Sequence, residues 1–384
     1  MKGFDADFPL CADEAADAAA RPAVIEAVRF LHKEIGIFAF DAVILTGSFS
    51  RGEGSILLSN PRHRILGDIE FLMIARPPFD FPTLRRDMKQ LGSKATDHLR
   101  GAGYEAIIEY SPAGRSYLER ALRPAIFSFD LLTHGKTVAG DPRLLESIPR
   151  FGPAEIPRED AVRLVMNRMM EIHSLRVQRN MEPVEEAYLG VKTILDLAGS
   201  LLAFQGRYVS GYGARLRAAQ ALDDEASFPR ALEGELARAV PMKLHPDERE
   251  ILRSAPPLSD ALDLAMDVWR WEMARLVTGE DTRELLYGFL ASERIWQTAR
   301  GWIKYYTHPL RPPEEMISLL RNLRLFFRAS PQRLAYASAL MAHHAERSGE
   351  AGESDEAARL LPSAGADQPL ARAIELWTWL VRNN

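Results

Sequence analysis

One stretch, from Ala42 to Ile74, constrains the fold of this chain more than any other. It begins with an apolar run that is typical of a strand (residues 42–45), passes through a turn of small residues, and continues into a second strand that starts near Gly67 and ends with the unbroken apolar run 71–74. A strand without polar alternation is typical of a position buried on both faces of a sheet. We therefore expect two buried strands connected through a glycine turn, with a helix beginning near Ser48.

The flanking sequence predicts further helices and strands around these two. Apolar residues at helical spacing predict helices over residues 22–35 and 84–99, and glycines close the second helix. Further strands are expected over residues 104–110 and 125–133, and the later one carries Asp130 among uncharged neighbours. We expect residues 1–21 to form an N-terminal arm and residues 54–66 to form a loop over the functional site.

Beyond Pro157 the pattern changes from strands to helices. Prolines at positions 149, 153 and 157 indicate a boundary there. Residues 348–366 are small and acidic, so we expect a mobile segment in a second, all-helical domain of residues 158–384. Candidate helices run over residues 158–180, 184–205, 228–240, 258–278, 281–300, 314–328, 331–347 and 368–382.

Length and composition favour a globular protein of two or three domains. The 384 residues are 47% hydrophobic and 26% charged, and no run of about 18 uncharged apolar residues suggests a membrane span. The acidic N-terminal residues do not fit a signal peptide, so we expect a cytoplasmic protein. A net charge of −5 does not favour a non-specific nucleic-acid binder, and the single cysteine, Cys11, excludes an internal disulfide.

Acidic residues at the start of the second strand are the first candidates for a functional site. Residues two apart on a strand point to the same face, which brings Asp68 and Glu70 together and turns Ile69 toward the core. Carboxylates are the side chains that Mg²⁺ prefers, and a cation would relieve the repulsion between them. Asp130 is a candidate third carboxylate, because a charge among apolar neighbours needs a partner.

The turn between the two strands supplies the other half of the pattern. Glycine at position 47 lets the backbone bend and approach a phosphate, and Ser48 follows at the start of the expected helix. Arg51 can either reach such a phosphate or pair with Glu53. No lysine follows the glycines as a P-loop requires, and the third glycine of a dinucleotide fingerprint is missing.

Together, Gly47-Ser48, Arg51-Gly52-Glu53, Asp68-x-Glu70 and Asp130 resemble the pattern of the nucleotidyltransferase superfamily, whose best-known member is DNA polymerase beta. The resemblance covers roughly residues 22–145 and is greatest to the minimal and aminoglycoside-modifying branches. It implies an α+β fold, in which a nucleotidyltransferase palm with a mixed sheet and flanking helices (residues 22–157) precedes the all-helical domain.

The resemblance also implies roles for individual residues. Asp68 and Glu70 would bind two Mg²⁺ ions, and Asp130 would bind the catalytic ion and help to activate the acceptor hydroxyl. Gly47, Ser48 and Arg51 would hold the nucleoside triphosphate. Lys192, on a helix of the second domain, would also be directed at the triphosphate, although an exposed pair with Asp196 is an equally good interpretation.

The expected reaction is transfer of a nucleoside monophosphate from a nucleoside triphosphate, with ATP as the expected donor, to a hydroxyl group. A small hydroxylated acceptor such as an aminoglycoside or another sugar fits the charge balance better than a polynucleotide. Three alternatives stay open: a transferase of a toxin–antitoxin type that modifies tRNA or a protein, a non-catalytic nucleotide-binding module, and an unrelated α/β protein. The acceptor, the base preference and the oligomeric state are not specified by the sequence.

Overall fold

The computed structural model describes residues 8–36, 39–59, 62–77, 81–178, 181–222, 230–307, 325, 327–348, 351–361 and 369–382. The chain forms two compact units. The first, which we call the sheet unit, contains Met1–Ala161 and Glu182–Ala261, and the second, the helical unit, contains Val162–Met181 and Leu262–Asn384. The mixed α+β class and the helical C-terminal part agree with the sequence-based expectation.

The sheet unit holds all the strands found in the described residues, together with helices on both sides of the sheet. Its elements in chain order are α1 (Glu14–Ile35), β1 (Phe40–Leu45), α2 (Gly47–Ser50), β2 (Ile56–Leu57), β3 (His63–Ala75), α3 (Phe81–Gly101), β4 (Tyr104–Gly114), a π-helical turn (Tyr117–Ala121), α4 (Ile126–His134), β5 (Lys136–Gly140), the first residues of α5 (Arg158–Gln178), α6 (Pro183–Phe204), α7 (Tyr212–Gln220), α8 (Arg230–Leu244) and α9 (Glu248–Ser254).

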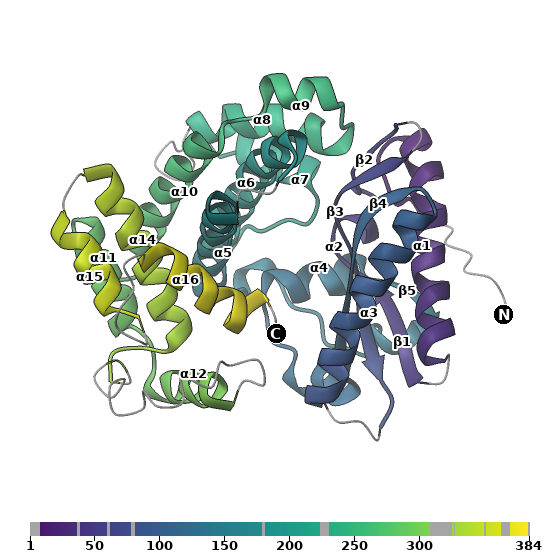
Figure 1. The fold of residues 1–384 in the computed structure, drawn as a ribbon, viewed down its shortest axis with the longest axis horizontal. Coiled ribbons are helices and arrows are strands. Elements are labelled where there is room, and N and C mark those ends of the chain that lie inside the picture. Colours follow the sequence, from purple (N-terminus) through teal and green to yellow (C-terminus); the bar gives the residue numbers. More distant parts are fainter. Residues whose placement is uncertain are drawn as a thin grey trace. The chain divides into compact units, whose positions relative to one another are not determined.

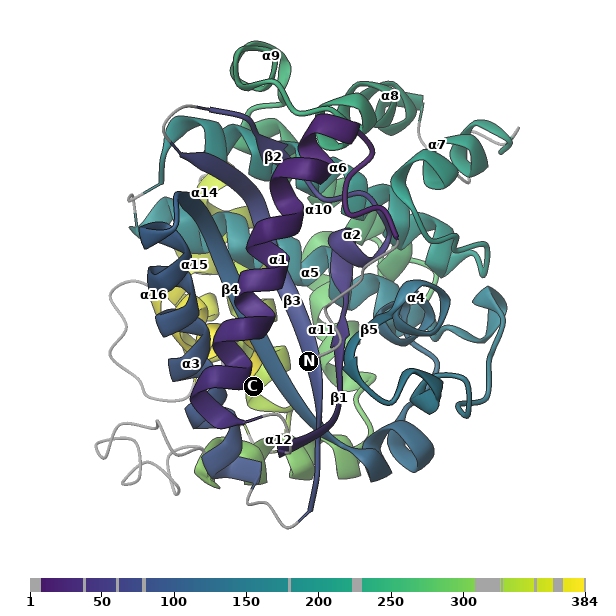
Figure 2. The ribbon, with the colours of Figure 1, turned by 90° about the vertical axis from the view of Figure 1, so that its right-hand side faces the viewer.

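Strand β3 is the centre of the sheet. It pairs with β1 in antiparallel orientation on one side and with β4 in parallel orientation on the other, while β2 pairs with its first residues and β5 pairs with β1. Figure 2 shows β3 and β4 running together behind α1. The sheet is therefore mixed, and its longest strand is flanked on both sides.

Two apolar clusters cover the two faces of the sheet. Ile69, Phe71 and Met73 of β3 pack with α1 and α3 on one face, whereas Leu72 and Ile74 pack with α4 and the segment after β5 on the other. Figure 1 shows α1 and α4 on opposite sides of the strands. The prediction that the run 71–74 is buried on both faces is thus confirmed, because its side chains alternate between two cores.

The prediction of a strand over residues 125–133 is wrong, because this segment forms helix α4. A short apolar run fits a buried strand or a buried helix equally well, and here a hydrogen bond from a residue distant in the chain favours the helix. The backbone N–H of Ile126 donates to Asp160 Oδ2 at 2.7 Å, and the Ser128 hydroxyl donates to the carbonyl of Ala125 at 3.1 Å. Asp130 therefore lies on a helix and not on a sheet strand.

Other boundaries also differ from the predictions. Helix α1 begins at Glu14, within the expected arm, because the Asp13 carboxylate caps its first turn. The expected loop over residues 54–66 contains β2 and the start of β3, and strand β5 was not predicted. Residues 351–359, within the segment expected to be mobile, form a helix. The helix predicted over residues 314–328 lies mostly outside the described residues.

After Pro157 the described residues contain helices and no strands, as predicted. The helical unit contains most of α5, most of α10 (Leu258–Met273), α11 (Thr282–Ala291), α12 (Ile295–Thr307), α14 (Pro331–Ser348), α15 (Ala351–Arg359), α16 (Pro369–Trp377) and a π-helical turn (Thr378–Arg382).

Among the described helices, α6 is long and apolar enough to cross a membrane. Its most apolar window of 18 residues is 83% buried inside the protein. This burial is the pattern of a core helix, and α6 packs against α7, α8 and α9 within the sheet unit.

Two buried histidines face each other in the helical unit. His173 of α5 and His343 of α14 lie with ring centroids 5.1 Å apart, and the Nδ1 atoms of both rings have no hydrogen-bond partner. Burial and the neighbouring His343 lower the pKa of His173 from 6.5 to about 3, and burial together with Arg176 lowers the pKa of His343. Both rings are therefore neutral in the folded protein at neutral pH.

We predict that the helical unit loses stability in mild acid. The imidazole of His173 binds a proton near pH 6.5 in the unfolded chain but only near pH 3 in the folded protein. The stability that depends on the neutral ring is therefore fully present above about pH 6.5 and is lost as the pH falls toward 3. His173 alone changes the free energy of unfolding by about 1.4 kcal/mol per pH unit within this range. Urea unfolding between pH 7 and 4 should show a smaller loss of stability for His173→Phe than for the unmodified protein. Equal slopes in His173→Phe and the unmodified protein would contradict the prediction.

Candidate functional site

The predicted glycine turn lies directly against Glu70. Gly47 begins α2 with φ +67°, in the left-handed region, and a Cβ atom at this position would lie 3.0 Å from Glu70 Oε2. The backbone N–H of Thr46 donates to the carbonyl of Glu70 at 2.9 Å. Ser48 lies in the first turn of α2 and is partly exposed. The turn and the acidic strand thus form one local structure, and the helix expected near Ser48 is present as the four-residue α2.

Asp68 and Glu70 share one face of β3, on the side opposite to Ile69 and Phe71. Burial raises the pKa of Glu70, and the neighbouring charge of Asp68 raises it further. The charges of Lys192 and Arg51 and a hydrogen bond from Thr46 act in the opposite direction. This is the electrostatic situation of two carboxylates that a cation would stabilise.

Asp130 does not complete a three-carboxylate cluster with them. Its carboxylate accepts hydrogen bonds from Arg51 Nη1 at 3.0 Å and from the Tyr208 hydroxyl at 3.1 Å, and Arg215 Nη2 lies 3.7 Å away. The described residues contain no group of three His, Cys, Asp or Glu side chains that could hold a metal ion. Two arginines and a tyrosine thus engage the oxygens of Asp130, and its predicted role as a metal ligand stays a prediction.

Arg51 is the centre of this ion-pair network. Its Nε atom donates to Glu53 Oε2 at 2.9 Å, and its side chain is only 7% exposed. Burial opposes the charge, but Tyr212, Asp130 and Glu53 outweigh burial and raise the pKa of Arg51 above its ordinary value. Of the two predicted interpretations of Arg51, the structure shows the pairing with Glu53.

The same network connects the turn to the helices that follow in the sheet unit. Glu53 Oε1 accepts a hydrogen bond from the backbone N–H of Tyr212, the first residue of α7, at 2.6 Å. Arg215 of α7 donates to the Tyr208 hydroxyl and lies over the Tyr212 ring, 5.1 Å from its centroid. Sequence reasoning missed these residues, because their partners are about 80 to 160 positions away in the chain.

Two lysines of the sheet unit differ in their surroundings. Lys192 of α6 is close enough to Glu70 to lower the pKa of its carboxyl group. Lys243 of α8 is 3% exposed and donates to the Tyr188 hydroxyl at 3.0 Å, which in turn donates to Ser55 Oγ at 2.8 Å. Burial, together with the charges of Lys192 and Arg51, lowers the pKa of Lys243. Two cations therefore act on Glu70, Lys192 of α6 and Arg51 after the Gly47 turn.

Glu109 of β4 is a further carboxylate that sequence reasoning did not single out. The parallel register pairs Glu70 with Glu109, and Ala106, Ile108 and Tyr110 of β4 pack into the core on the opposite face. Glu109 is therefore exposed on the same face as Glu70. Alternation along residues 104–110 could have indicated its exposure, but the register with β3 depends on the tertiary fold.

The residues present fit one bound Mg²⁺ ion. Magnesium is usually held by one or two carboxylates with phosphate oxygens and water filling the other positions, and Asp68 and Glu70 supply two. The like charges and the partial burial of Glu70 are the observations that favour a cation here. The second ion expected from the resemblance depended on Asp130, whose carboxylate is engaged elsewhere.

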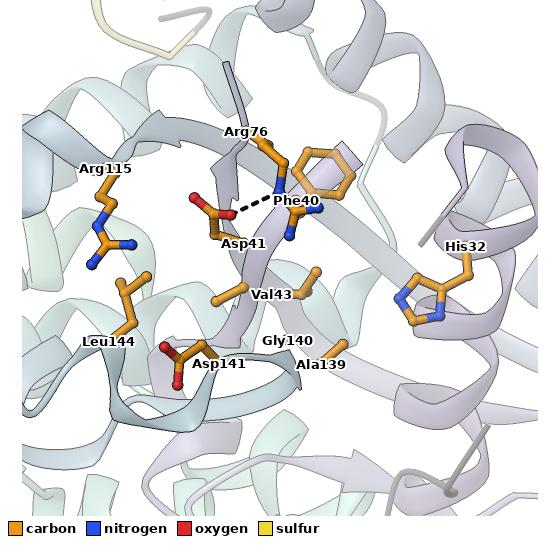
Figure 3. A pocket seen from close by; sticks show the side chains of 11 residues that line it. His32, Phe40, Asp41, Val43, Arg76, Arg115, Ala139, Gly140, Asp141 and Leu144 are labelled. Atoms are coloured by element: carbon orange, nitrogen blue, oxygen red, sulfur yellow. Dashed lines mark hydrogen bonds and ion pairs between the residues drawn. The ribbon is translucent and has the colours of Figure 1, made fainter. Parts of the chain in front are cut away.

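A separate cavity of about 500 Å³ lies at the opposite end of β1, and none of the predicted site residues lines it. Figure 3 shows Asp41 paired with Arg76 in this cavity, at 2.9 Å, with Arg115 and Asp141 nearby. Its acids and arginines neutralise one another, since Arg115 pairs with Glu119 at 2.7 Å. We therefore assign the functional site to the other end of β1, where it meets Gly47.

Comparison of the chain with protein-family models, with curated protein sequences and with solved structures found no match.

The contact between Gly47 and Glu70 can be tested with a matched pair of variants. Gly47 and Gly36 both have positive φ angles, so an alanine at either position strains the backbone. Only the alanine at position 47 meets another group, the Glu70 carboxylate. We predict that Gly47→Ala shifts the Glu70 carboxyl signal in ¹³C NMR spectra and that Gly36→Ala does not. An unchanged signal in Gly47→Ala would show that the turn does not contact Glu70.

Removing Asp130 should destabilise the sheet unit strongly. Asp130→Ala leaves Arg51 buried beside Glu53 alone and removes the carboxylate that lies beside Arg215, so we expect a loss of about 3–5 kcal/mol in the free energy of unfolding. Replacing the exposed Asp97 by alanine is the control and should cost less than about 0.5 kcal/mol. Similar losses for the two variants, measured by urea unfolding, would refute the network.

Proposed function

We propose that the sheet unit is a Mg²⁺-dependent nucleotidyltransferase, which moves a nucleoside monophosphate from a nucleoside triphosphate, with ATP as the expected donor, to a hydroxyl group of a small acceptor. The observation that carries this proposal is the contact of the Glu70 carboxylate with the Gly47 turn, beside Asp68 on the same face of β3. A glycine that brings the backbone close to a carboxylate pair lets a phosphate and a cation lie side by side.

Electrostatics supports a polyphosphate as the ligand of this site. Lys192 lowers the pKa of Glu70, and both Lys192 and Lys243 belong to helices that pack together within the sheet unit. Phosphoryl-type transfer depends mainly on positioning and on neutralising charge, which cations around a carboxylate pair provide. A bound Mg²⁺ ion would supply further charge neutralisation on the phosphate oxygens.

In the proposed reaction the acceptor oxygen forms a bond to the α-phosphorus, and the bond from that phosphorus to the oxygen leading to the β-phosphorus breaks. Pyrophosphate leaves, and the proton of the hydroxyl group passes to a carboxylate. We assign this proton to Glu109, which lies in register with Glu70 on the same face and is exposed. Arg51 and Asp130 act as positioning residues, because their ion pair holds the segment that follows the turn.

Labelled nucleotides test the proposed function directly. The protein is incubated with Mg²⁺ and each α-³²P-labelled nucleoside triphosphate, together with kanamycin, glucose, bulk tRNA or no added acceptor. We expect label on a small hydroxylated acceptor, and a loss of about 10²–10³-fold in Asp68→Asn, which removes charge stabilisation at the reacting phosphate. Asp97→Asn, an exposed change on α3, should leave the rate unchanged.

Other results of this labelling assay distinguish the alternative functions. Label on tRNA or on the protein itself would favour the corresponding alternative acceptor. Triphosphate binding that Asp68→Asn abolishes, without transfer to any acceptor, would favour a non-catalytic nucleotide-binding module. Binding and transfer that survive unchanged in Asp68→Asn would refute the proposed metal site.

A further inference from the structure

Strand β4 presents an exposed aliphatic side chain on the face that carries the acidic pair. Ile107 is 52% exposed, although its neighbours Ala106 and Ile108 are buried in the core between the sheet and the helices α1 and α3. A large aliphatic group that stays exposed within a long strand lacks the stabilisation that burial gives such a side chain. A ligand that covers it would restore part of this stabilisation.

The register places Ile107 beside the acidic pair. Asp68 is paired with Ile107 and Glu70 with Glu109 in the parallel ladder between β3 and β4. Because side chains of paired residues point to the same face, Ile107 lies next to Asp68, and Glu109 lies next to Glu70. The β4 side of the acidic pair thus consists of one apolar and one acidic side chain.

The opposite side of the acidic pair is formed by the turn after β1. Strand β3 lies between β1 and β4, and the Gly47 turn contacts Glu70 from the β1 side. In nucleotidyl transfer the attacking and leaving oxygens lie roughly in line with the phosphorus. If the leaving pyrophosphate is held at the Gly47 turn, the acceptor hydroxyl must approach from the side of β4.

We propose that the acceptor binds over β4 and that Ile107 contacts it and helps to determine which acceptor is used. This inference rests on the proposed function and adds the position and the chemical class of the acceptor. Glu105 and Glu109 flank Ile107 on the same face, and Glu105 is paired with Arg64 at 2.8 Å. The Glu109 carboxylate beside this aliphatic group repels a polyanion such as tRNA and suits a hydroxylated ring that is neutral or cationic and has an apolar C–H face.

Cysteine modification can test this proposal, because the chain has a single native cysteine. Cys11 is buried, and burial together with the charge of Asp17 raises the pKa of its thiol to about 12, so it reacts slowly with maleimides. Ile107→Cys places a reactive thiol on β4. Leu58→Cys is the matched control, because Leu58 is equally exposed, at 52%, and follows the short strand β2.

Both variants are treated with N-ethylmaleimide and assayed with Mg²⁺, labelled triphosphate, and kanamycin, glucose or tRNA as acceptor. We expect modified Ile107→Cys to lose transfer to the small acceptor by more than tenfold while its affinity for Mg²⁺-ATP changes by less than twofold, and modified Leu58→Cys to keep both. Unmodified Ile107→Cys should raise the KM for the acceptor and leave the KM for ATP unchanged.

Retained transfer in modified Ile107→Cys, or a loss of ATP binding there, would overturn the acceptor position. Transfer to tRNA as the main acceptor would overturn the proposed chemical class. If the unmodified native protein transfers label to no acceptor, the proposed function itself fails, and this result is distinct from a failure confined to Ile107.

Discussion

The ion pair that Arg51 makes with Glu53 and Asp130 is the interaction on which the site depends most. Arg51 is nearly buried, so its charge is stable only while both carboxylates remain in place. Asp130 brings helix α4 to this arginine, and Glu53 receives the first backbone N–H of α7. A single guanidinium thus fixes the segment after the Gly47 turn against two helices. Because the turn contacts Glu70, the same interaction limits where the acidic pair can lie.

Strand β3 organises the chemistry that we propose. It presents Asp68 and Glu70 on one face, and its two neighbouring strands supply different partners. On the β1 side a glycine turn approaches Glu70 closely, and on the β4 side Ile107 and Glu109 lie in register with the acidic pair. This asymmetry is the physical basis for assigning the leaving group to one side and the acceptor to the other. The cavity in Figure 3 lies at the far end of β1 and has no part in this arrangement.

Local patterns predicted the parts of the site that lie close together in sequence. Period-two spacing placed Asp68 and Glu70 on one face, and the glycine before Ser48 indicated the turn and the short helix. The sequence pattern predicts a strand at Asp130, because a short and largely apolar segment does not distinguish strand from helix. The residue that caps the helix, Asp160, lies 34 positions later in the chain than Ile126. Glu109, Tyr208 and Arg215 reach the site through strand register and helix packing, which single-sequence periodicity does not encode. The strand pattern therefore predicts the placement of the acidic pair but does not predict which residues surround it.

The central claim is that Asp68 and Glu70 hold a divalent cation together with a nucleoside triphosphate. Electron paramagnetic resonance of Mn²⁺, which can replace Mg²⁺ at carboxylate sites, measures this directly in the presence of ATP. We predict one bound Mn²⁺ per chain in the unmodified protein when ATP is present, and a loss of affinity of at least tenfold in Glu70→Gln. Bound Mn²⁺ that is unchanged in Glu70→Gln, or no ATP-dependent binding in the unmodified protein, would contradict the claim.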